Sequence, residues 1–109
     1  MLMENCIFCK IASGQIPKKF RYQDENIVAF DDINPQASTH VVFIPRDHIE
    51  NFEMLTDDSI LASVRRGMQE VVKEKKLVGR GYKVLVNGGG AQVVEHLHFH
   101  LIGPIGLKI

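Results

Sequence analysis

Three histidines alternate with apolar residues near the end of the chain, and this pattern constrains the fold more than any other feature. His96, His98 and His100 are separated by Leu97 and Phe99. Successive side chains of a β-strand point to opposite faces, so the three imidazoles share one face and the apolar residues the other. A row of imidazoles is costly to bury unless each ring finds a partner. The pattern predicts a half-buried strand whose histidine face binds a metal, an anion or both, rather than an adventitious metal-binding patch.

The composition is typical of one ordinary domain and not of a nucleic-acid binder. The chain has 109 residues, and its 13 basic and 13 acidic side chains give a formal net charge of zero. Electrostatic binding of nucleic acid or of a membrane surface needs a cationic face. No apolar stretch is long enough to span a bilayer, and no signal-peptide pattern follows Met1. We therefore expect a single domain over residues 1–109, in the cytoplasm, with neither nucleic acid nor a membrane as partner.

Hydrophobic periodicity predicts two helices and five strands. A short helix is expected over Cys6–Ser13, and a long amphipathic helix begins after a Thr56 N-cap and ends at Gly79. The expected strands are Phe20–Gln23, Asn26–Asp31, His40–Pro45, Tyr82–Val86 and Val93–Ile102. Hairpin-length connections dominate, which favours antiparallel pairing over βαβ winding. The predicted class is α+β, an antiparallel sheet of about five strands with one long and one short helix.

The two cysteines form a C-x-x-C pair, Cys6 and Cys9. Taken alone, the pair is compatible with structural thiols, a redox couple or metal ligands. No thioredoxin-like βαβ pattern surrounds it, and the separation of Cys9 from His48 is not that of a zinc finger. The residues by themselves leave these three interpretations open.

Several motifs together resemble the histidine triad (HIT) family of nucleotidyl hydrolases and transferases, in its HINT-like branch. The histidine signature is His96-x-His98-x-His100 followed by apolar residues. The other similar segments are Cys6–Ile11, Gly14–Pro17, Phe30–Ala37, Thr39–His40 and Ile44–Ile49. Each segment is weakly specific alone, but together they cover most of the chain. The resemblance implies the HIT-like fold and a homodimer formed by the long helix and the Tyr82–Val86 strand.

The resemblance assigns the reaction to the middle histidine, which matches His98. It implies hydrolysis of the P–N bond of purine nucleoside 5′-phosphoramidates through a nucleotidyl-histidine intermediate. Imidazole suits this role, because its neutral form attacks phosphorus without a separate base and divides one displacement into two easier steps. His100 and His40 match histidines that support the phosphate. A histidine at position 100, where the transferase branch commonly has glutamine, favours hydrolysis.

The resemblance also implies the residues that bind the nucleotide. Asp32 matches the acid that accepts hydrogen bonds from the ribose hydroxyls, and Asn87 matches a phosphate-contacting asparagine. The other implied binding residues are Gln92 and an apolar slot for the base, formed by Phe8, Ile11, Phe30, Ile33 and Val42. Without the resemblance, the apolar set is assigned to the core and the aspartates to the turn before Asn34-Pro35.

Two departures from the family pattern lie beside this site. The loop from Asn87 to Gln92 is shorter than the usual HINT loop, and Val93 stands where Ser or Thr is common. A valine cannot relay a proton to a leaving amine. These departures favour one alternative, a non-catalytic nucleotide-binding module held by zinc. A second enzymatic alternative is hydrolysis of dinucleoside polyphosphates, as in the fragile-histidine-triad branch, and it ranks behind because the stretch from Asp32 to Ala37 is nearer to HINT.

A structural zinc is the cofactor that the resemblance implies. Some bacterial HIT proteins bind zinc through four residues that match Cys6, Cys9, His48 and His96. Two thiolates and two imidazoles suit a closed tetrahedral Zn²⁺, which is a structural rather than a hydrolytic arrangement.

Overall fold

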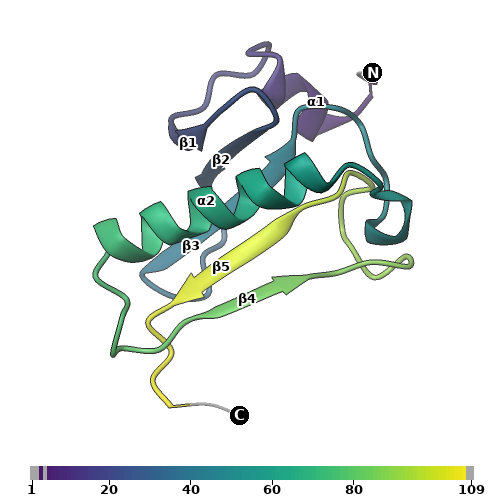
Figure 1. Ribbon diagram of the computed structural model, residues 1–109. Helices are drawn as coiled ribbons and strands as arrows, with labels where there is room; N and C mark the ends of the chain where they lie inside the picture. The colour runs from purple at the N-terminus through teal and green to yellow at the C-terminus, as the bar shows by residue number, and fades with distance from the viewer. Residues whose placement is uncertain (1–2, 4, 108–109) are drawn as a thin grey trace.

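The chain folds into a five-stranded antiparallel sheet with helices on its two faces (Figure 1). This computed structural model describes residues 3 and 5–107. The helices are α1 (Ile7–Ala12) and α2 (Asp58–Glu74), and a 3₁₀ turn, η1, spans Phe52–Met54. The strands are β1 (Phe20–Gln23), β2 (Ile27–Asp31), β3 (Thr39–Pro45), β4 (Lys83–Val86) and β5 (Phe99–Gly103). Their order is β1-β2-β3-β5-β4 with every neighbouring pair antiparallel, so the predicted α+β class is confirmed.

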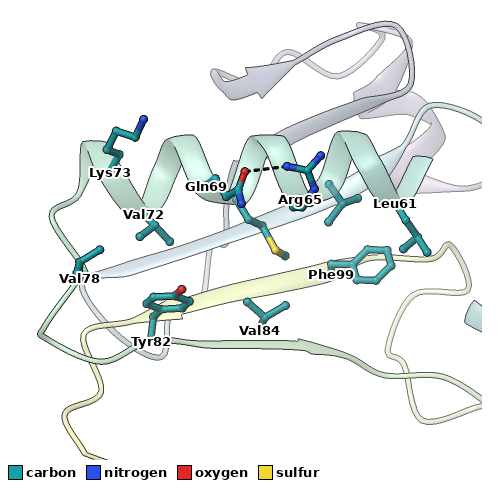
Figure 2. Close-up of a pocket in the computed structure, with 11 residues that line it drawn as sticks. Leu61, Arg65, Gln69, Val72, Lys73, Val78, Tyr82, Val84 and Phe99 are labelled. Carbon is teal, nitrogen blue, oxygen red and sulfur yellow. Dashed lines mark hydrogen bonds between the residues drawn. The ribbon is translucent and has the colours of Figure 1, made fainter. Parts of the chain in front are cut away.

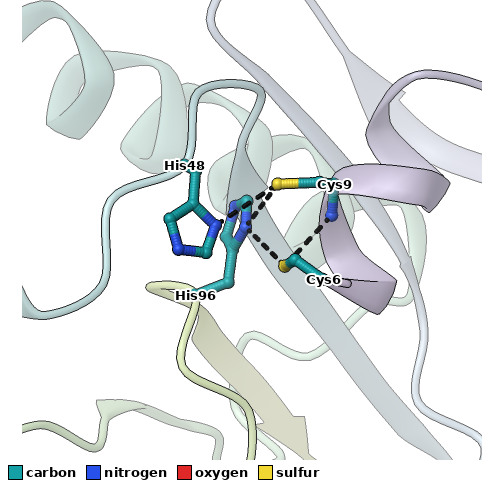
Figure 3. Close-up of side chains that lie close together, drawn as sticks. All are labelled: Cys6, Cys9, His48 and His96. Carbon is teal, nitrogen blue, oxygen red and sulfur yellow. Dashed lines mark hydrogen bonds between the residues drawn. The ribbon is translucent and has the colours of Figure 1, made fainter. Parts of the chain in front are cut away.

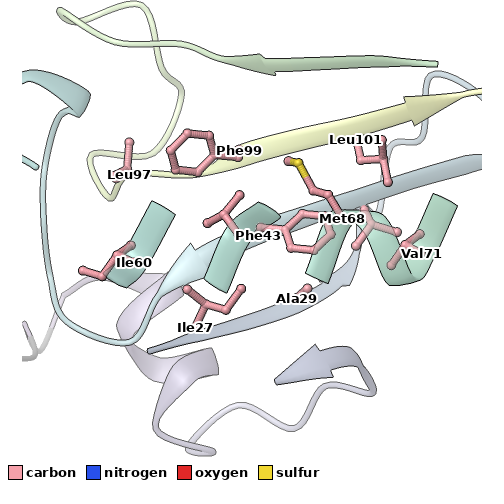
Figure 4. Close-up of a cluster of buried hydrophobic side chains, with 11 residues drawn as sticks. Ile27, Ala29, Phe43, Ile60, Met68, Val71, Leu97, Phe99 and Leu101 are labelled. Atoms are coloured by element: carbon pink, nitrogen blue, oxygen red, sulfur yellow. The ribbon is translucent and has the colours of Figure 1, made fainter. Parts of the chain in front are cut away.

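Alternate residues of the central strands build two separate cores, one on each face of the sheet. Towards α2, Phe43, Phe99 and Leu101 pack against Met68 and Val71 (Figure 4). On the other face, the intervening residues pack against α1 in a smaller cluster that includes Ile11, Val28, Phe30, Val42 and Ile44. His40 and His100 alternate with residues of the α2 core, so they lie on the α1 face.

Both ends of α2 differ from the sequence prediction. Asp57, not Thr56, is the N-cap, because its side chain accepts a hydrogen bond from the Ser59 N–H at 2.9 Å. The helix also ends before Gly79. Lys76 adopts a left-handed φ of 54°, and the Leu77 N–H bonds back to Val72. Leu77 is almost fully buried, so the chain reverses early in order to bury this residue.

The histidine-bearing segment is a strand only in its second half, so the predicted strand Val93–Ile102 is wrong for its first residues. Regular pairing begins at Phe99, opposite Phe43 of β3 and Val86 of β4. Before that point β3 ends at Pro45, which has no N–H to donate to a neighbour. The Leu97 N–H bonds instead to the Ile49 carbonyl of the following loop, at 2.6 Å. The segment before Phe99 is consequently irregular, although its side chains still alternate in direction.

The helices within residues 3 and 5–107 do not have the length and hydrophobicity that a membrane-spanning helix needs. None of them is both long enough and apolar enough to cross a membrane.

Candidate functional site

Three histidines meet on the α1 face of the sheet, two from strands β3 and β5 and one from the segment just before β5. His40 begins β3, His100 belongs to β5, and His98 lies just before β5. The His98 and His100 rings are 5.0 Å apart between centroids, and Nε2 of His40 lies 2.8 Å from Nδ1 of His100. Asp32 brings its Oδ2 within 3.4 Å of the same His40 nitrogen. The structure thus collects the three predicted catalytic histidines and the predicted ribose-binding acid in one place.

Hydrogen bonds to the main chain determine which nitrogen of each ring carries a proton. His98 Nδ1 lies 2.8 Å from the His96 carbonyl oxygen, and because a carbonyl only accepts, Nδ1 is the donor. Nε2 of neutral His98 is therefore left with a free lone pair. His40 has the opposite tautomer, because its Nδ1 accepts a hydrogen bond from the Gln36 N–H at 3.1 Å. His40 consequently donates from Nε2 to His100 Nδ1, which leaves the proton of neutral His100 on Nε2.

Burial keeps two of these rings uncharged at neutral pH. It lowers the pKa of His100 from 6.5 to about 4, assisted by the neighbouring His98 and His40 and opposed by Asp32. Burial also lowers the pKa of His40, against the opposing influence of the Asp32 carboxylate. Two neutral imidazoles beside His98 act as hydrogen-bond donors and acceptors rather than as fixed positive charges.

The four predicted metal ligands form a compact cluster next to this site (Figure 3). Cys6 caps α1, Cys9 lies within α1, His48 follows β3, and His96 precedes His98. Their donor atoms all lie within 4.8 Å of one another. The separations from His96 Nδ1 to the two sulfur atoms are 3.3 and 3.5 Å, and Cys9 Sγ lies 3.3 Å from His48 Nδ1. Tetrahedral Zn²⁺ with bonds of about 2.0–2.3 Å requires donor separations of roughly 3.3–3.8 Å, so the donor set fits the ion.

Surrounding groups prepare the cluster for a cation. His96 Nε2 lies 2.9 Å from the Pro45 carbonyl and donates to it, so the lone pair on Nδ1 points at the two thiols. Burial lowers the pKa of His96 from 6.5 to about 4, which keeps the ring in the neutral form that a metal requires. Burial also raises the pKa of the Cys9 thiol, so a bound cation is the natural means of removing its proton.

Two aromatic rings extend the site beyond the histidines. Phe8 of α1 meets Phe30 of β2 edge-on with centroids 5.8 Å apart, and it meets His98 at 5.1 Å. Ile11 and Val42 lie in the same apolar cluster. Ile33 lies in the turn after β2, outside this cluster, with its side chain 79% exposed. The structure therefore brings four of the five residues predicted to contact the base into one apolar cluster.

The glycine-rich loop after β4 is held by amide side chains. Gln92 is buried, donates to the Glu50 carbonyl and to Asn51 Oδ1, and accepts the Gly90 N–H. Asn51 Oδ1 also accepts the Gly89 N–H at 3.0 Å. Gln92, expected to bind substrate, is therefore engaged within the protein, while Asn87 is exposed. Sequence reasoning missed the Asn51 contribution, because no local pattern indicates a contact between residues this far apart in the chain.

A groove lies on the α2 side of the sheet, on the face opposite the histidines, and is lined by side chains of α2 and β4 (Figure 2). This α2–β4 groove encloses about 700 Å³. Apolar side chains that remain exposed along it are Leu61, Val78, Tyr82 and Val84. Arg65, Gln69 and Lys73 supply the polar part of its lining. β4 is also the last strand of the sheet, so within residues 3 and 5–107 one of its edges has no neighbouring strand.

Comparisons with known proteins agree with the geometry. A family model described as "Scavenger mRNA decapping enzyme C-term binding" matches residues 5–106. A HIT-like protein of Methanocaldococcus jannaschii is 41% identical, over 89% of this chain and 77% of its own. The crystal structure of a HIT family hydrolase from Legionella pneumophila superimposes with a TM-score of 0.86 at 40% identity, covering 95% of this chain and 96% of that one. A Candida albicans adenosine 5′-monophosphoramidase is 39% identical, over 90% of this chain and 69% of its own.

The fold, the histidine site and these matches together define the class of protein. The chain belongs to the histidine triad (HIT) family.

The neutral His100 ring makes a testable contribution to stability. Its pKa of about 4 lies below the ordinary value of 6.5, so the unfolded chain binds a proton more readily than the folded one. The contribution of neutral His100 to the free energy of unfolding is fully present above about pH 6.5, and it is lost as the pH falls towards about 4. We expect the free energy of unfolding of His100→Gln to decrease less than that of the wild type between pH 7 and pH 4.5. Urea unfolding across this range measures the difference, and parallel profiles for the two proteins would contradict it.

Proposed function

We propose that this chain, as one HIT domain over residues 1–109, hydrolyses the P–N bond of purine nucleoside 5′-phosphoramidates. One observation carries the proposal: the 2.8 Å bond from His98 Nδ1 to the His96 carbonyl, which leaves Nε2 as a nucleophile. The Legionella pneumophila relative is named a hydrolase and the Candida albicans relative an adenosine 5′-monophosphoramidase, and these names support the assignment.

In the proposed reaction the His98 Nε2 lone pair attacks the α-phosphorus. A bond forms between Nε2 and phosphorus, the P–N bond to the amine breaks, and a nucleotidyl-histidine results. Water then attacks the same phosphorus and gives a proton to the solvent, the bond from phosphorus to Nε2 breaks, and the nucleoside monophosphate is released with the imidazole regenerated. His100, oriented by His40, donates a hydrogen bond from Nε2–H to the phosphate oxygen, and the departing amine takes up a proton from the solvent.

The substrate is oriented by groups on either side of His98. Asp32 accepts the Asn34 N–H at Oδ1, so Oδ2 is the oxygen that it offers to the ribose hydroxyls. Phe8, which is half-buried and meets His98, provides apolar ring surface for the base, and the almost fully buried Phe30 supports it from β2. Asn87 is exposed at the end of β4, where it is free to approach the phosphate.

We further propose that Cys6, Cys9, His48 and His96 hold a structural Zn²⁺. Four protein donors would close its coordination sphere and leave no position for substrate. When bound, the ion would tie α1 and the loop after β3 to the residue whose carbonyl orients His98. Free cysteines at this site also fit a reducing compartment, and we assign the protein to the cytoplasm.

A second copy of the chain is the occupant we assign to the α2–β4 groove. Exposed apolar side chains there would be covered if two copies met about a two-fold axis, because each patch then faces itself. The free edge of β4 continues the same surface, which agrees with the homodimer implied by the family resemblance.

Replacing the nucleophile should abolish turnover without unfolding the protein. We expect His98→Ala to lower kcat/KM for a fluorogenic adenosine phosphoramidate by at least about 10³-fold, because the covalent step is lost. Circular dichroism establishes that the variant is folded, and intact mass spectrometry detects the nucleotidyl adduct in the wild type. Equal turnover by both proteins would reject His98. If the wild type turned over diadenosine polyphosphates and not the phosphoramidate, the dinucleoside polyphosphate hydrolase would be favoured. If it bound nucleotides without turning over either substrate, the non-catalytic nucleotide-binding module would be favoured.

Removing zinc should destabilise the protein reversibly. Protein purified without a tag should contain about one zinc per chain, and chelation should lower Tm by about 10 °C or more. Re-added Zn²⁺, but not Mg²⁺, should restore Tm, since thiolate ligands select against magnesium. Cys9→Ser should contain little zinc and respond little to the chelator. A wild type with well under one zinc per chain would reject the site.

A charge in the α2–β4 groove should separate the two copies. Sedimentation velocity at about 10 µM should give the mass of a dimer for the wild type and of a monomer for Val84→Glu, because the glutamate would be buried without a partner. Val93→Glu is the matched control, since Val93 is 98% exposed and lies outside the groove. A monomeric wild type, or dissociation of the control as well, would contradict the proposed interface.

A further inference from the structure

Lys18 lies beside the aromatic rings of the proposed nucleotide site. Its Nζ is 5.5 Å from the centroid of the Phe30 ring. Lys18 is half-buried in the segment that leads into β1, whereas the neighbouring Lys19 is exposed. A cation over an aromatic face is attracted by the negative charge density of the ring, so this contact holds the ammonium group in place. The reaction proposed above has no role for it.

A row of contacts connects this ammonium group to the nucleophile. Phe30 meets Phe8 with ring centroids 5.8 Å apart, and Phe8 meets His98 at 5.1 Å. Phe30 is only 4% exposed, so its position is fixed by the sheet and by the cluster around it. A nucleotide with its α-phosphate at His98 and its base against the half-buried Phe8 and the small exposed part of Phe30 would direct the outer edge of the base towards Lys18.

An ammonium group distinguishes between purines by hydrogen-bond type. It carries three donors and no acceptor. Along the edge that contains N7, guanine presents two acceptors, N7 and O6, whereas adenine presents the N7 acceptor and a 6-amino donor. Lys18 can therefore donate to both positions of guanine, while a donor facing the adenine amino group is left without a partner.

We propose that Lys18 is a specificity-determining residue that makes the site prefer 6-oxopurine nucleotides over 6-aminopurine nucleotides. This inference rests on the proposed function, because it takes the Phe8–Phe30 slot as the base site. The positive charge also attracts the phosphate, but that attraction is the same for every nucleoside monophosphate. The ratio of affinities for two bases isolates the contact at the base edge.

Isothermal titration calorimetry with GMP, IMP and AMP tests the proposal. We expect the wild type to bind GMP and IMP about five-fold more tightly than AMP, as a charge-assisted hydrogen bond at a half-exposed position allows. IMP is included because it has the 6-oxygen without the 2-amino group of guanine. Lys18→Met keeps an apolar stem and should bring the ratio close to one, and Lys18→Glu should favour AMP by presenting an acceptor. Lys19→Met and Lys19→Glu make the same changes one residue away and should preserve the wild-type ratio.

Each contrary result identifies what has failed. Equal binding of GMP and AMP by the wild type overturns the assignment of Lys18 while leaving the nucleotide site intact. An equal loss of affinity for all three nucleotides in Lys18→Met also overturns it, because the lysine then acts only on the phosphate. Tight binding of GMP but not IMP would assign the preference to the 2-amino group instead. No binding of any nucleotide would reject the proposed function together with the inference.

Discussion

His96 is the residue on which the arrangement of the site depends. Its ring donates a hydrogen bond from Nε2 to the Pro45 carbonyl and directs Nδ1 to Cys6 and Cys9. Its own main-chain carbonyl accepts a hydrogen bond from His98 Nδ1–H. The orientation of the His96 ring and that of His98, the proposed nucleophile, are therefore linked through one residue. Because His96 is completely buried, neither of its nitrogens can exchange a protein partner for water without cost. Whatever stabilises the cysteine cluster thereby also stabilises the tautomer of His98.

The irregular segment before β5 makes this link geometrically achievable. A regular strand through residue 96 would commit the main-chain groups of that segment to ladder hydrogen bonds. Pro45 ends β3 without an N–H, and the segment is instead supported by the loop that follows, through the bond from the Leu97 N–H to Ile49. The same loop carries His48 and, through Asn51, holds the glycine-rich turn. One loop thus supports the proposed metal ligands, the proposed nucleophile and the turn beside them.

The sequence predicted the elements of this fold better than their ends. Alternation and spacing identified both helices and all five strands, because apolar periodicity is a local property of the chain. The end of α2 was wrong because it depends on burying Leu77, and the start of β5 was wrong because it depends on Pro45 of another strand. Tertiary context decides each of these cases.

The site chemistry depends on main-chain partners that no sequence motif encodes. Two groups of side chains here have the composition of a metal site, the cysteine cluster and the set Asp32, His40 and His100. A metal-bound imidazole normally donates its other N–H, as His96 does to Pro45. His40 does the reverse, because its Nδ1 accepts the Gln36 N–H and its proton must remain on the nitrogen that faces His100. A carbonyl therefore orients one cluster with a lone pair directed at the two thiols, and an amide N–H orients the other as a chain of hydrogen bonds that runs from His40 to His100.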